Sequence, residues 1–173
     1  YEKAFEATRK CAAEFDWDAT VANMVWVWTG LTEAISMRYY AVPGIHLPAD
    51  KAFQYLEPPE DNAWMRENEY DALIEDPTGY LYNAWLPRVA NDVAAPGEPA
   101  TLRSNLSFVK GGMAMLSYFA GLAQQNERLK AESGTVAAIS GILKAPFDIL
   151  ADKLRGYKGL CMDLFRQPDK VVA

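Results

Sequence analysis

The acidic side chains best placed for chemistry are Asp148 and Asp152, near the end of the chain. They are four residues apart, so on a helix they lie on the same face. They directly follow Pro146, and the positive end of a helix dipole favours carboxylates in the first turns. We predict both as candidate catalytic groups. The structural alternative is that Asp148 caps the helix and Asp152 pairs with Arg155 at the surface.

Three neighbours of these carboxylates are predicted to bind a substrate: Lys144, Phe147 and Arg155. They follow Val136–Leu143, an apolar run of small and branched residues that predicts a strand. A strand, a loop and a helix in this order form one βα unit. In a β/α barrel the loops after the strands build the active site.

Other residue types that often do chemistry are sparse. The single histidine, His46, lies in a loop and is expected to pack there, with a ligand or proton-transfer role as the alternative. Cys11 and Cys161 have no neighbours at metal-binding spacing. We expect free thiols that are buried or partly buried, as is typical of a cytoplasmic protein, and we predict no metal site in this chain.

Length, composition and charge limit the classes of protein. The 173 residues suffice for one domain with a substantial core. The net charge of −6 comes with no basic stripe, so no nucleic-acid partner is expected. No apolar run reaches the ~18 residues of a membrane span, so no membrane partner is expected either. The five Trp and nine Tyr are expected to pack the core or to line a pocket for an apolar ligand.

The first third of the chain predicts a helix and two strands. The helix covers Tyr1–Lys10. Thr20–Trp28 is apolar and β-branched and is interpreted as a strand ended by Gly30, although a buried helix shows the same pattern. Leu31–Ser36 predicts one or two helical turns, and Met37–Val42 a second strand that ends at a Pro-Gly turn.

Helices are predicted to dominate the rest of the chain. They cover Glu67–Glu75, Tyr80–Ala90 and Leu102–Lys130, with interruptions at Pro87 and Gly111-Gly112. Residues 45–60 and 91–100 are predicted loops. Many helices with few strands favour the α/β class, as a helix-rich part of a (β/α)8 barrel with a helical insertion. The helical patterns at both ends indicate one partial domain, 1–173, truncated at both ends.

Several segments resemble the uroporphyrinogen decarboxylase superfamily, which also contains corrinoid-dependent methyltransferases that act on coenzyme M and related thiols. The likeness is carried by Ala145-Pro146-Phe147, Leu154-Arg155-Gly156 and the stretch Asp163–Val171. Ala41-Val42-Pro43-Gly44 adds to it, as does Glu69-Tyr70-Asp71 with Ile74-Glu75-Asp76-Pro77. The resemblance implies a (β/α)8 barrel of which this chain is roughly the first half to the middle.

The resemblance also allows a comparison of site residues. In the decarboxylases an Asp on an early strand holds the pyrrole nitrogens, and the matching place here is near Val27. The decarboxylases have a Tyr six residues after the loop proline, where this chain has Asp152. Both differences argue against decarboxylation of a tetrapyrrole. The methyltransferase branch uses a zinc site that makes a thiolate, with ligands in the second half of the family's domain.

We therefore expect a methyltransferase-like enzyme that acts on a methyl donor or a corrinoid-linked substrate, with zinc and a corrinoid implied by the resemblance for a full-length protein. One alternative is uroporphyrinogen III decarboxylase, of porphyrin and haem biosynthesis. Another is a non-catalytic module that binds a corrinoid protein. The chain alone is expected to be inactive, and to pair with another copy or with the missing half of the barrel, because an open half barrel exposes strand edges.

Overall fold

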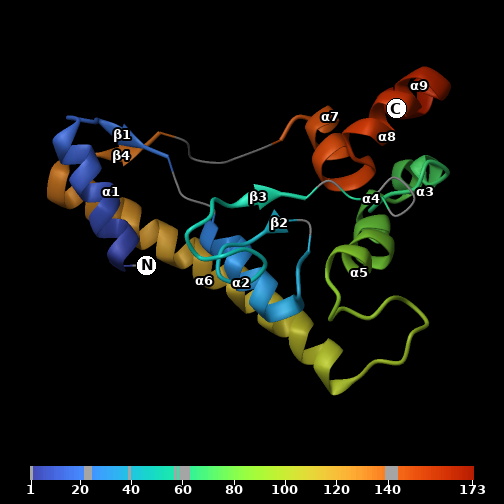
Figure 1. Ribbon diagram of the computed structural model, residues 1–173, viewed down its shortest axis with the longest axis horizontal. Coiled ribbons are helices and arrows are strands. Elements are labelled where there is room, and N and C mark those ends of the chain that lie inside the picture. The colour runs from blue at the N-terminus through green and yellow to red at the C-terminus, as the bar shows by residue number, and fades with distance from the viewer. Residues whose placement is uncertain (1, 22–24, 39, 57, 59–62, 139–143) are drawn as a thin grey trace.

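The computed structural model describes residues 2–21, 25–38, 40–56, 58, 63–138 and 144–173, with the backbone alone at 25–28. The fold is helix-rich and mixed α/β (Figure 1). In chain order the described elements are α1 (Glu2–Glu14), β1 (Ala19–Thr20), α2 (Val25–Ile35), β2 (Tyr40–Ala41), β3 (Gln54–Tyr55), α3 (Tyr70–Glu75), α4 (Pro77–Tyr80), the π-helix η2 (Leu81–Trp85), α5 (Leu86–Val89), α6 (Leu102–Ser133), β4 (Val136–Ala137), α7 (Pro146–Ile149), the π-helix η3 (Leu150–Arg155), α8 (Tyr157–Arg166) and α9 (Pro168–Val172).

The long helix α6 runs without a break, so the predicted interruption at Gly111-Gly112 is wrong. It begins at a capping box between Thr101 and Ser104 and ends at Gly134, whose φ of 74° is left-handed. Gly111 lies in the middle because α2 crosses there: a Cβ at this position would lie 3.0 Å from the Ile35 side chain. The predicted break at Gly30 is wrong for a related reason, since Gly30 lies inside α2, facing Ala114.

The predicted strand Thr20–Trp28 is also wrong over most of the described part. Only Ala19 and Thr20 are extended, and Val25–Trp28 form the first turn of α2. The helical alternative was therefore the better interpretation for Val25–Trp28. A continuous apolar segment has no periodicity that separates a strand from a helix packed on several sides. The predicted helix at the start of the chain is confirmed as α1.

The described strands form two separate pairs. β1 and β4 are parallel, with Ala19 opposite Val136, and β2 and β3 are antiparallel, with Tyr40 opposite Tyr55. The predicted strand Val136–Leu143 is confirmed for its first two residues, and 139–143 lie outside the described residues. These short pairs do not by themselves make a barrel.

The predicted helix Tyr80–Ala90 is present as α4, η2 and α5 in direct succession. Pro87 does not interrupt it, because a turn of π-helix precedes the proline and Pro87 falls in the first turn of α5. The wider turn removes the need for the backbone N–H that proline lacks. α3 is shorter than predicted and begins at Tyr70.

Within the residues that the structure describes, two buried clusters form the core. One packs α2 and α6 around Trp64 and Val89, and the other packs α3 and α4 against η3, α8 and α9 around Met65. Trp85 contacts both clusters and joins them. Figure 1 shows the consequence: α3–α5 and α7–α9 gather at one end, α1 with β1 and β4 at the other, and α6 runs along the molecule between them. A side-chain contact between Tyr40 of β2 and Lys153 of η3 links two of these parts and builds the candidate site.

Candidate functional site

The candidate site is centred on Lys153, in the π-helix η3. Its Nζ donates a hydrogen bond of 2.6 Å to the hydroxyl of Tyr40, which lies 113 residues earlier in β2. The same ammonium lies 4.1 Å from the centroid of the Tyr40 ring. A cation at this distance from an aromatic face is attracted to the ring electrons. Tyr40 thus meets Lys153 with both its ring and its hydroxyl.

Lys153 differs from an ordinary lysine in its acidity. Burial lowers the pKa of Lys153 to about 7, and the positive charge of Lys144 adds to this effect. A lysine amine of ordinary pKa, near 10.4, is almost fully protonated at neutral pH, whereas Lys153 is present as amine and ammonium in comparable amounts. Burial also raises the pKa of the Tyr40 hydroxyl, which stays protonated. Perturbed amines of this kind are common at functional sites.

Asp152 and Lys144 complete the charges around Lys153. The Asp152 carboxylate forms an ion pair with the Lys144 ammonium, and Asp152 is partly buried. The alternative pair of Asp152 with Arg155 is not formed. Two of the residues predicted from the sequence are thereby brought together beside Lys153. The site contains two lysines and one carboxylate, so it can attract an anion.

Neighbouring aromatic residues hold the site in place. Tyr40 stacks on Phe53 at 4.6 Å between ring centroids and meets Tyr55 edge-on at 5.9 Å. On the other side, the Trp85 indole N–H donates a 2.5 Å hydrogen bond to the carbonyl of Lys153. The π-helical turn leaves carbonyls without their usual helical donors, and Trp85 satisfies this one. The position of Lys153 is therefore determined by β2, β3 and η2 as well as by its own helix.

The remaining predicted residues lie elsewhere. Phe147 and Asp148 are exposed on α7. Asp148 does not cap this helix: the N-cap residue is Ala145, and no side chain forms a capping hydrogen bond there. Arg155 is buried, so its guanidinium faces the core rather than the lysine pair.

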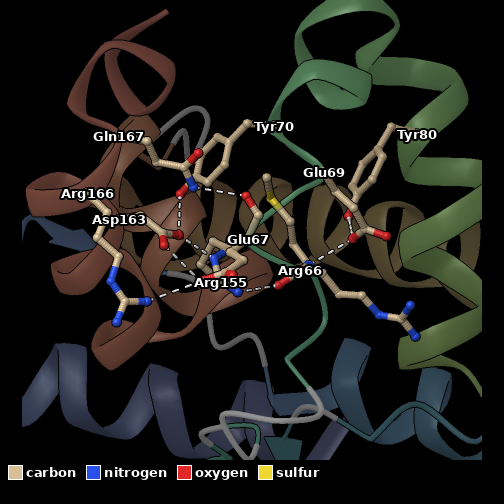
Figure 2. A network of polar contacts seen from close by, with 10 residues as sticks. Arg66, Glu67, Glu69, Tyr70, Tyr80, Arg155, Asp163, Arg166 and Gln167 are labelled. Atoms are coloured by element: carbon tan, nitrogen blue, oxygen red, sulfur yellow. Dashed lines mark hydrogen bonds and ion pairs between the residues drawn. The ribbon is translucent and has the colours of Figure 1, made fainter.

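Arg155 belongs to a buried polar network with Asp163 and Tyr70 (Figure 2). The guanidinium donates to Asp163 Oδ2 at 2.5 Å and to Oδ1 at 3.2 Å, and also to the carbonyl of Met65 at 2.8 Å. The Tyr70 hydroxyl donates to the same carboxylate at 3.0 Å. Asp163 is 0% exposed. Burial and the adjacent carboxylate raise the pKa of Tyr70. The network ties α3 to η3 and α8.

A second network joins α3 to α5. Arg88 donates two hydrogen bonds of 2.7 Å to the Glu69 carboxylate and a third of 3.0 Å to the carbonyl of Trp64. Burial by itself raises the pKa of Glu69, but hydrogen bonds from Arg88, from the Arg66 N–H and from Tyr80 outweigh it and lower the pKa to about 2. Figure 2 shows Glu69 between Arg66 and Tyr80. The first network includes Arg155 of η3, the helix that carries Lys153, and the second joins the residue before α3 to α4 and α5.

Histidine, cysteine and metal chemistry receive little support from the described residues. His46 Nδ1 accepts a 3.1 Å hydrogen bond from the Val42 N–H, as the predicted loop-packing role requires. Cys11 is partly buried, but Cys161 is exposed, contrary to the expectation. Within the described ranges, no three His, Cys, Asp or Glu side chains lie close enough to hold a metal ion.

Neither Lys153 nor Tyr40 was predicted as a site residue from the sequence. A local signal for Lys153 was its place three residues after Leu150 and next to Leu154, an apolar pattern that puts it near the core-facing side of a helix. No such signal existed for Tyr40, because its role depends on a contact between distant segments.

Comparisons with known proteins found no matching family model, curated protein or solved structure.

Proposed function

We propose that Lys153, Lys144 and Tyr40 bind a small anionic substrate, and that Lys153 transfers a proton to or from it. The observation that carries the proposal is the hydrogen bond from Lys153 to Tyr40 beside a second lysine. Asp152 neutralises Lys144, so the charge offered to an anion is that of the protonated Lys153, in a chain whose net charge is −6. In a partly buried site, an anion gains more from a cation than it would in water.

The reaction we propose follows the resemblance to the uroporphyrinogen decarboxylase superfamily, in its methyltransferase branch. Methyl transfer to a thiol requires a thiolate, because the thiolate is the nucleophile. A neutral Lys153 can take the proton: the S–H bond of the thiol breaks, an N–H bond forms at Nζ, and the resulting ammonium stabilises the thiolate. The pKa of an ordinary thiol, near 8.5, is within about 2 units of that of Lys153, so the transfer is energetically accessible.

Asp152 is assigned a positioning role in this proposal. Its ion pair holds the Lys144 ammonium near Lys153, and that ammonium favours the neutral form of Lys153. The resemblance also implies zinc and a corrinoid. The residues that the structure describes do not assemble a set of metal ligands, and the role proposed for Lys153 depends on neither group.

Two probes test the proposal by calorimetry: ethanesulfonate and 2-mercaptoethanesulfonate, which is coenzyme M. Binding is measured at pH 6 and pH 8 in buffers of different ionisation enthalpy, which gives the number of protons taken up. At pH 8 the free Lys153 is mostly neutral, and a bound anion raises its pKa. When ethanesulfonate binds, we expect the protein to take up a proton from the buffer at pH 8 and almost none at pH 6. Binding of the thiol probe should take up fewer protons from the buffer, because the thiol of the probe supplies the proton to Lys153.

Three variants make the test specific. Lys153→Met should raise the dissociation constants of both probes at least tenfold and abolish the proton uptake that accompanies binding. Lys153→Arg keeps the charge but does not titrate, so it should bind ethanesulfonate without uptake. Lys10→Met, an exposed lysine of α1, should behave like the unmodified chain. Undetectable binding of both probes, or equal binding to the Lys153→Met chain, would overturn the proposal.

A further inference from the structure

Helix α6 presents an apolar stripe that nothing in the described part of the chain covers. Its members are exposed and follow one face of the helix from its first residue to Ala123. We call this stripe the α6 seam; it consists of Leu102, Leu106, Val109, Met113, Leu116, Ala120 and Ala123. Leu102 is 76% exposed and Leu116 71%. The opposite face, with Ser107, Gly111 and Tyr118, is buried, largely against α2.

The spacing along the α6 seam specifies a helix as its partner. Successive members are separated by four and three residues in turn, through three heptads. This average period of 3.5 residues is that of a helix packed along its length on another helix. A sheet or an irregular surface imposes no such period. Because α2 already covers the other face, the partner helix is an additional one.

We propose that the α6 seam pairs with the α6 seam of a second copy of this chain, in antiparallel orientation. The reason is complementarity of size. The seam has large side chains toward the N-terminal end and two alanines toward the C-terminal end. Antiparallel pairing places Met113 on Leu116 in the two central layers. In the next layers outward it places large against small, Val109 on Ala120 and Leu106 on Ala123 of the second copy. Parallel pairing would place alanine on alanine in two layers and leave gaps.

The residues beside the seam fit the same arrangement. Phe119 is 56% exposed and would lie over Gly112 of the second copy, where a Cβ would meet nothing within 4 Å in the single chain. Lys110 would face Ser117, and Arg103 would face Gln124. The cations thus meet neutral side chains, and no like charges are opposed. Antiparallel pairs bring equivalent flanking positions together in this way.

The large side chains of the seam are exposed enough to contribute to an interface. Its five large side chains and the adjacent Phe119 are between 46% and 76% exposed, and a standard interface buries about 800 Å² per partner. By length and composition α6 is also long and apolar enough to cross a membrane, although the sequence analysis expects no membrane partner. Pairing with a second copy is favoured over membrane insertion because the polar side chains of Arg103, Asn105 and Lys110 flank the seam. In a membrane, lipid would surround the helix and contact these polar side chains as well.

Analytical ultracentrifugation tests the pairing. The unmodified chain should sediment as a dimer. Leu116→Glu places a carboxylate in both central layers and should raise the dissociation constant at least 100-fold while the circular dichroism spectrum stays helical. Phe165→Glu is the matched control, since Phe165 is 88% exposed on α8, away from the seam, and should leave the dimer intact.

Cross-linking tests the orientation. Met113→Cys and Leu116→Cys are made separately in a Cys11→Ser, Cys161→Ser chain. Oxidation of the mixed chains should give mainly the 113–116 disulfide, whereas a parallel pair would give 113–113 and 116–116. Monomeric sedimentation of the unmodified chain would overturn the proposal. So would a Leu116→Glu chain that remains a dimer, or a monomer that binds phosphatidylcholine vesicles through this face.

Discussion

A buried ion pair between Arg155 and Asp163 lies beside the second core cluster, the one around Met65. The Arg155 and Asp163 side chains are 8% and 1% exposed. Arg155 also donates a hydrogen bond to the carbonyl of Met65, and Asp163 also accepts one from the Tyr70 hydroxyl. A buried pair adds little net stability compared with apolar residues, but removal of one partner leaves a charge in the core. This asymmetry makes the pair a sensitive reporter of the structure.

Asp163→Asn should therefore lower the free energy of unfolding by about 3–5 kcal/mol, because Arg155 keeps its charge without a counterion. Urea denaturation at pH 7 measures the loss. Asp71→Asn is the control: Asp71 pairs with Lys170 at 2.5 Å, but its side chain is 72% exposed. This control should change stability by less than about 1 kcal/mol. Equal effects of the two substitutions would contradict the buried pair.

Glu69 should make stability depend on pH in the acidic range. Its folded pKa of about 2 is below the usual value of 4.5, so its stabilisation is present above pH 4.5 and is lost as pH falls toward 2. Glu69→Gln should cost roughly 3 kcal/mol at most at pH 7, and the cost should shrink steadily below pH 4.5. Thermal unfolding from pH 2 to pH 7 measures this. A cost that is constant with pH would contradict the assigned hydrogen bonds.

Helices and strands were predictable where the sequence has a clear period. α1 and α6 are amphipathic or capped, and both were found, whereas the apolar run Thr20–Trp28 was assigned to the wrong class. The predictions based on glycine were wrong: breaks were predicted at Gly30 and Gly111 because glycine weakens an isolated helix. In the folded chain both lie inside helices that pack closely together. These glycines are explained by contacts between two helices, and such tertiary contacts cannot be recognised from the neighbouring sequence.

The close approach of α2 to α6 predicts opposite effects for two adjacent glycines. Gly111→Ala should be destabilising by about 1–3 kcal/mol, since its Cβ would lie 3.0 Å from Ile35. Gly112→Ala should stabilise by about 1 kcal/mol, because alanine favours the helix and a Cβ meets nothing within 4 Å. Both are compared by urea denaturation in the Leu116→Glu background, where α6 is expected to be unpaired. Stabilisation by Gly111→Ala would contradict this packing.

Across the chain as a whole, the candidate site contains some of the residues predicted from the sequence and leaves out others. Lys144 and Asp152 were predicted and do lie together, yet Arg155 has a structural position and Lys153 was missed. The low pKa of Lys153 arises from burial and from the positive charge of Lys144, and this burial depends on how distant segments pack. The α/β class was likewise predictable, while the barrel stays a prediction of the resemblance.

The acidity of Lys153 is the most direct test of the proposed site. The lysines are dimethylated with ¹³C, the Lys153 signal is assigned by its loss in Lys153→Arg, and its chemical shift is followed from pH 5 to pH 11. We predict a pKa of about 7 for Lys153, which rises when ethanesulfonate is added. A Lys153 that titrates near 10.4 like an exposed lysine, or that does not respond to ethanesulfonate, would contradict the proposed site.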